Sequence, residues 1–130
     1  MGVVRNNAIG NFSVSSAALS RQFTIAALAG GATFTSSGLL VQGLPRIQIQ
    51  AASNGASVNA VEVTLQGAIT QSGTAPEFFD IGKFVLVTGA AAPSLFFEYN
   101  AAVEFIRVVC SNTSAIGASA DFKIRLMACQ

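Results

Sequence analysis

The sequence predicts an all-β protein that folds as an antiparallel two-sheet β-sandwich, of which the jelly roll is one form. Helical periodicity is hard to find, whereas short segments with period-two alternation recur at the spacing typical of all-β folds. Residues that favour turns separate these segments. About eight or nine strands are expected, which is too many for one small open sheet, so two packed sheets are predicted.

The composition indicates a single domain, over residues 1–130, that associates with other protein. A hydrophobic fraction of 52% excludes intrinsic disorder, and 130 residues suffice for one core. Charged residues make up 10% of the chain, against roughly 25% in ordinary soluble domains. An uncharged surface protects poorly against association, so we interpret the chain as an assembly component. A small secreted sandwich with a neutral polar surface is the simpler alternative.

The first strands follow a weakly patterned segment. Residues 1 to about 18 are small and polar, with Arg5 as their only charge, and are expected to form an extended N-terminal arm or an edge segment. The uncharged stretch 22–45 has nearly the length of a membrane span, but glycines and a Ser/Thr cluster interrupt it, so no membrane partner is expected. The expected strands cover residues 21–27, 32–35, 37–43, 44–51, 58–66, 81–89, 94–100, 103–112 and 120–129.

The strands 44–51 and 58–66 have the cleanest alternation and are expected to form a hairpin. Ile47 and Ile49 form the core row of the first strand, and Val61 and Val63 belong to that of the second. A three-residue loop over 54–56 would set these core residues opposite one another. The prediction includes a positive φ at Gly55 or a neighbour of it.

The last strands carry the least ordinary pattern. Residues 84–87 are apolar on both rows, which is typical of a strand buried on both sides or lying at a subunit contact. The strands 103–112 and 120–129 are expected to close the chain as a hairpin. On the first of them Arg107 interrupts a second apolar row formed by Val103, Phe105 and Val109.

The residues give no support for catalysis, a metal site or a cofactor. The chain has no histidine, and the only acidic residues close in sequence, Glu77 and Asp80, lie beside two phenylalanines in a loop expected to fold onto the core. Cys110 and Cys129 are expected on opposite sides of a sheet as free thiols, which fits synthesis in a reducing compartment. Tyr99 is the one candidate for a carbohydrate platform, although a tyrosine at a sandwich edge is the commoner explanation.

Two stretches resemble small β-sandwich proteins of tailed-phage virions. FFEYNAAVEFIRVVCSNTSAIGASADFKIRLMA is similar to their closing strands, and VEVTLQGAITQSGTAPEFFDIGKF is similar to their preceding strand and long loop. The sequence departs from the pattern by lacking the tryptophan often found in that loop, which leaves the subfamily open. The resemblance implies a non-enzymatic structural virion protein of the capsid decoration (cement) type, made in the host cytoplasm. A phage tail or spike component, or a receptor- or glycan-binding module, is the alternative.

The expected partners are other copies of the chain, most simply in a trimer, and the major capsid protein or another virion protein. A net charge of +1 without runs of Lys or Arg gives no reason to expect nucleic acid. An Arg that rests on apolar surface is typical of a protein contact, although an internal ion pair of Arg107 with Asp121 or Glu104 would also explain it. The candidate interface residues are Arg5, Phe105, Arg107, Val109, Lys123, Arg125 and Met127.

Overall fold

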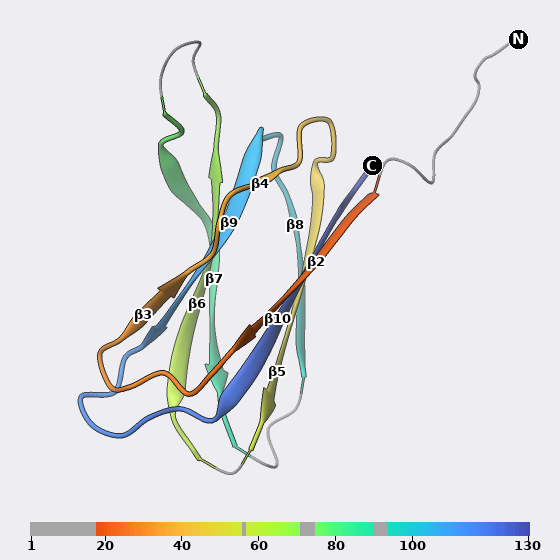
Figure 1. Ribbon diagram of the computed structural model, residues 1–130. Coiled ribbons are helices and arrows are strands. Elements are labelled where there is room, and N and C mark those ends of the chain that lie inside the picture. The colour runs from red at the N-terminus through yellow and green to blue at the C-terminus, as the bar shows by residue number, and fades with distance from the viewer. Residues whose placement is uncertain (1–17, 56, 71–74, 90–93) are drawn as a thin grey trace, which may run out of the picture.

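The computed structural model describes residues 18–55, 57–70, 75–89 and 94–130, which form two facing antiparallel β-sheets without a helix (Figure 1). One sheet has four strands in the order β2-β10-β5-β8, and the other has five, in the order β3-β9-β6-β7 with β4 also paired to β9. The predicted all-β sandwich is confirmed. The strands are β2 (Ala18–Ile25), β3 (Thr33–Thr35), β4 (Leu39–Leu40), β5 (Arg46–Asn54), β6 (Ala60–Ala68), β7 (Phe78–Val87), β8 (Leu95–Asn100), β9 (Phe105–Asn112) and β10 (Asp121–Cys129).

The strand order is that of a jelly roll when β3 and β4 are taken as two parts of one strand. The chain passes from one sheet to the other at most of its connections. In the described part of the chain, β6 and β7 are the only consecutive strands that pair with each other.

The core lies between the sheets and is made by the alternate residues of every long strand. On the last two strands the inward-facing residues are at most 2% exposed: Ile106, Val108, Cys110, Phe122, Ile124 and Leu126. Burying one such aliphatic or aromatic side chain contributes about 1.5–3 kcal/mol to folding. The opposite row of each strand therefore faces outward.

Two aromatic pairs close the open sides of the sandwich. The ring centroids of Phe84, on β7, and Phe97, on β8, are 4.6 Å apart, and those of Phe23 and Phe34, on the opposite side, are 6.2 Å apart. Each pair joins the edge strand of one sheet to the edge strand of the other. They cover core that the edge strands alone would leave open to water.

Both predicted hairpins are wrong, and for the same reason. β5 and β6 lie in different sheets, so Ile49 lies opposite Leu126 and Phe97 rather than opposite Val61. β9 and β10 also lie in different sheets, and β10 pairs with β2 and β5. In a sandwich, the inward-facing residues of two strands can contact each other across the core instead of lying side by side in one hairpin. The alternation pattern is the same in both arrangements. The positive φ predicted for the 54–56 turn is confirmed, at 129° for Gly55.

The residues predicted as an N-terminal arm lie mostly outside the described part of the chain, because the first described strand begins at Ala18. Arg5 is among them. Within the described ranges, no helix has the length and apolar character needed to cross a membrane.

Candidate interaction surfaces

The candidate interface residues within the described ranges, which exclude Arg5, lie on two opposite outer faces, not on one. Phe105, Arg107 and Val109 point outward from β9, in the five-stranded sheet, whereas Lys123 and its neighbours point outward from β10, in the four-stranded sheet. The predicted closing hairpin would have placed these residues on one face, and they lie on two because that hairpin does not form. We call the two surfaces the Arg107 face, which comprises Thr64, Gln66, Phe78, Asp80, Lys83, Val85, Phe105, Arg107 and Val109, and the Arg125 face, which comprises Gln22, Gln48, Gln50, Phe96, Lys123, Arg125 and Met127.

On the Arg107 face, three neighbouring strands hold one guanidinium in place. The guanidinium carbon of Arg107 lies 4.0 Å from the centroid of the Phe78 ring on β7. Its Nε donates a hydrogen bond of 2.8 Å to Oε1 of Gln66, on β6. The Gln66 amide in turn donates to Oδ1 of Asp80 at 2.9 Å. Because the ring and the amide fix the plane of the guanidinium, its two terminal nitrogens are presented in a defined direction.

The alternative role of Arg107, an internal ion pair, is wrong for the residues that the structure describes. Asp121 accepts a hydrogen bond from the backbone nitrogen of Ala27 at 2.9 Å. Glu104 accepts hydrogen bonds from the backbone nitrogen and the hydroxyl of Thr70. Across these residues the one ion pair joins Lys83 to Glu62, at 3.8 Å and partly exposed.

The surroundings of Arg107 are mainly apolar or uncharged. Phe105 and Val109 are half-buried beside it on the same strand, and the Thr64 side chain is 7% exposed although it faces outward. At the far end of β7, Val85 is 51% exposed and Val87 is 53% exposed. Burial of residues 84–87 on both sides is therefore wrong within the chain, because Phe84 and Leu86 fill the core and the two valines point outward at a sheet edge. The alternative, a subunit contact, stays a prediction.

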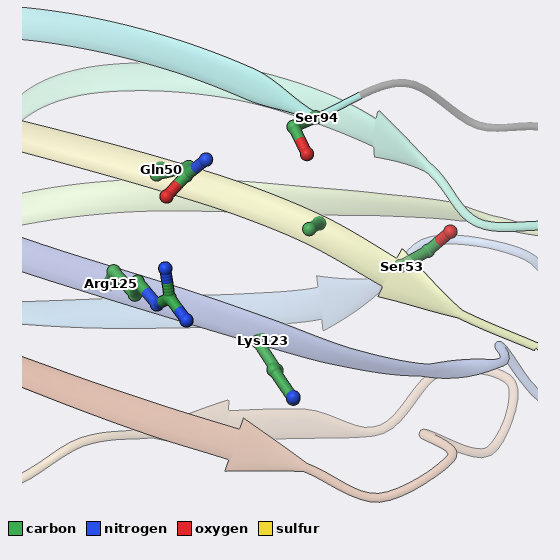
Figure 2. Close-up of a pocket in the computed structure, with 6 residues that line it drawn as sticks. Gln50, Ser53, Ser94, Lys123 and Arg125 are labelled. Atoms are coloured by element: carbon green, nitrogen blue, oxygen red, sulfur yellow. The ribbon is translucent and has the colours of Figure 1, made fainter.

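The Arg125 face carries a second guanidinium held in a similar way. Nε of Arg125 donates to Oε1 of Gln22, on β2, at 2.8 Å. A hollow of about 360 Å³ lies beside it and is lined by Gln50, Ala52, Ser53, Ser94, Lys123 and Arg125. Figure 2 shows Arg125 and Gln50 side by side on β10 and β5, with Lys123 nearer the start of β10 and Ser94 immediately before β8. Around this hollow two cations lie beside amide and hydroxyl groups, while Arg46 and Glu98 lie further away on the same outward rows.

Sequence reasoning missed Phe96, whose side chain is 60% exposed on the Arg125 face. The signal was present in the pair Phe96-Phe97, because consecutive residues of a strand point to opposite faces and one of the two rings must point outward. Tyr99, which the sequence offered as a platform, instead packs half-buried against the core, and burial raises the pKa of its hydroxyl. The interpretation of Tyr99 as a sandwich-edge tyrosine is the one that the structure supports.

The two cysteines are free and separated by the fold. Cys110 is buried in the core on β9, where burial raises the pKa of its thiol to about 12. Cys129 is half-buried at the end of β10, and its thiol is 3.8 Å from the carbonyl oxygen of Arg46. A thiol with a raised pKa is a poor nucleophile at neutral pH. Within the described ranges, no group of three or more metal-ligating side chains comes together.

Comparison with known proteins identifies no family. No protein-family model matches the chain, and no curated protein matches it. Among solved structures, the SPBc2 prophage-derived protein YomS has a TM-score of 0.46 at 8% identity, over 85% of this chain and 93% of its own. A chain in the structure of the infectious bursal disease virus Gx strain has a TM-score of 0.45 at 15% identity, over 87% of this chain and 31% of that one. A chain of the Bacillus endospore appendages, described as a family of disulfide-linked pili, has a TM-score of 0.44 at 11% identity, over 86% of this chain and 88% of that one. Since all three TM-scores are below 0.5, function must be argued from the chain's own residues.

Proposed function

We propose that the chain is a non-enzymatic structural protein of a virion, of the capsid decoration type, that binds the capsid lattice as a homo-oligomer. The single observation that supports this most is Arg107, which is held between Phe78 and Gln66 on an outer face and forms no ion pair among the described residues. The sequence resemblance to phage β-sandwich proteins supports the virion setting. A trimer is the simplest oligomer consistent with such a role.

The Arg107 face has the composition of a protein contact. The cores of protein interfaces are poor in charged residues and rich in aromatic residues and Arg, and Arg is common among the residues that dominate binding energy. Phe78, Phe105 and Val109 lie around the guanidinium, and the Asp80 carboxylate is linked to it through Gln66. A carboxylate on the partner would complete the pairing that the described residues of this chain leave open.

The exposed valines of β7 extend this surface to the edge of the sheet. Val85 and Val87 lie on the same outward row as Lys83, and Val85 lies directly opposite Glu62. An edge strand with exposed apolar side chains readily adds a neighbouring chain. We propose that self-association uses this edge, while Arg107 engages the lattice. Several weak contacts made together by an oligomer then give tight attachment through effective concentration.

Two measurements on the full chain test the proposal. Light scattering at micromolar concentration should give a mass above that of the 13.3 kDa monomer. Co-sedimentation with capsids assembled from the major capsid protein of the same genome should deplete the chain from solution. The same capsids, once saturated, should leave further chain in the supernatant.

The alternative assignment gives opposite results. A tail component would bind purified tails and leave capsids bare. A monodisperse monomer that sediments with neither particle would contradict a structural role in the virion. Single-particle imaging of the intact virion would then show no density for the sandwich on the capsid surface.

A further inference from the structure

Two adjoining hollows lie on the Arg125 face. The hollow beside Lys123 adjoins a second one of about 370 Å³, and the two share Gln50 and Arg125. We call these two hollows together the groove; their lining extends from Lys123, past Gln50 and Arg125, to Phe96. The remaining lining of the second hollow is Ser20, Gln48, Leu126 and Met127.

One end of the groove is built to receive an anion. Neither Lys123 nor Arg125 forms an ion pair within the part of the chain that the structure describes. The nearby Glu98 accepts a hydrogen bond from Gln48 at 3.0 Å. Arg125 is oriented through its Nε by Gln22, which leaves its terminal nitrogens free to form a two-pronged contact with a carboxylate or sulfate.

The other end of the groove offers an apolar platform beside amide groups. The Phe96 side chain is 60% exposed, and Phe96 lies directly opposite Gln50 in the sheet register. A pyranose ring has one face of C–H groups that can lie on such a ring, and hydroxyls around its edge that bind amides and hydroxyls. A free phosphate would use the cations but would leave the exposed ring without a partner.

We propose that this groove binds an anionic saccharide, with its carboxylate or sulfate on Arg125 and Lys123 and a sugar ring on Phe96. The site is on the face opposite to Arg107, so saccharide binding and capsid attachment can be tested separately. A particle carrying the chain by its Arg107 face would present this groove to the outside.

Chemical-shift titration of the ¹⁵N-labelled full chain tests the proposal with four compounds: sialyllactose, sulfated lactose, lactose and inorganic phosphate. The two anionic sugars should shift the amides of β5 and β10 around Gln50 and Arg125, and lactose should bind at least about tenfold more weakly, the worth of one hydrogen bond to a charged group. Comparing the two anionic sugars distinguishes a carboxylate from a sulfate ligand. Raising the salt concentration should weaken both.

Three variants assign the binding to the groove. Arg125→Ala and Phe96→Ala should each weaken sialyllactose or sulfated lactose binding by about tenfold, because each removes one of the two contacts that define the ligand class. Both side chains are exposed, so the melting temperature should stay near that of the wild type. Arg107→Ala, which removes the matching guanidinium from the opposite face, should bind these sugars normally.

Three results would overturn the proposal. The first is the absence of shifts with either anionic sugar. The second is phosphate binding as tightly as the sugars, which would indicate a bare anion site. The third is binding of the sugars that Phe96→Ala and Arg125→Ala leave unchanged.

Discussion

The guanidinium carbon of Arg107 lies 4.0 Å from the centroid of the Phe78 ring, so the start of one strand sets the orientation of a cation near the start of another. The two residues belong to β9 and β7, with β6 between them, and Gln66 of β6 holds the Arg107 Nε at 2.8 Å. The arrangement keeps a planar donor group ready on an outer face. Preorganisation of this kind lowers the entropy that binding must overcome.

Replacing the ring beneath the guanidinium should weaken attachment without unfolding the chain. Phe78→Leu keeps an apolar side chain but removes the cation–π contact, so we expect a loss of about 0.5–1 kcal/mol in capsid binding. Phe79→Leu is the matched control, because Phe79 is next in sequence, is 49% exposed and points to the other side of β7. Equal losses for the two variants in a sedimentation assay would show that the contact has no special role.

Gly82 should be intolerant of any side chain because of Tyr99. A Cβ atom on Gly82 would lie 2.2 Å from Cε1 of the Tyr99 ring, which is far too close. Gly82→Ala should lower the free energy of unfolding by about 1–3 kcal/mol, the usual cost of overpacking. Urea denaturation gives this value.

A double-mutant cycle tests the cause of that cost. In a Tyr99→Ala background the space is vacant, so Gly82→Ala should cost clearly less than it does alone. The same cost in both backgrounds would mean that the backbone beside the bulge at Leu65/Gln66, rather than the ring, requires the glycine. Tyr99→Phe, which removes only the hydroxyl, is the control for the loss of the polar group.

Because the Cys110 thiol is buried, we expect the free energy of unfolding to fall at high pH. Its pKa is raised from 9.0 to about 12 by burial, so the folded state holds the proton more tightly than the unfolded state does. The contribution of the protonated Cys110 thiol to the free energy of unfolding is fully present below pH 9 and is lost as the pH rises from there toward 12. Cys110→Ala should be less stable at neutral pH but should lose less stability between pH 9 and pH 11 than the wild type. Identical pH profiles for the two proteins would contradict this linkage.

The sequence was enough to predict which residues of each strand face the core, but not which strands pair with each other. Alternation fixed which side of β5, β6, β9 and β10 faces the core, as Ile47, Val63 and Phe122 show with 0% exposure. Alternation has the same appearance whether two strands pair in a hairpin or face each other across a core. The Asn54-Gly55 turn is compatible with both, and the jelly-roll topology uses it to change sheets.

For the candidate sites, single residues could likewise be identified from the sequence, but their neighbours from other strands could not. A cation on an apolar row identified Arg107 as unusual, but its partner Gln66 is 41 residues away and reaches it only through the β6–β9 register. The groove on the Arg125 face was not foreseen, because it needs β8 beside β5, and this neighbour relation is a consequence of the topology. Of the groove's residues, Lys123, Arg125 and Met127 were predicted as interface residues, and Phe96 could have been added to them from the local sequence.

The central claim, that Arg107 is a contact residue, is tested most directly by measuring both melting and capsid attachment for Arg107→Ala, with Arg125→Ala as the matched control from the opposite face. Arg107 is half-buried and its partners Phe78 and Gln66 remain solvent-accessible, so its removal should change the melting temperature little. Attachment should weaken by about 1–4 kcal/mol, the range of interface hot spots. Arg125→Ala should attach normally. An Arg107→Ala chain that melts early yet attaches as tightly as the wild type when folded would contradict the account.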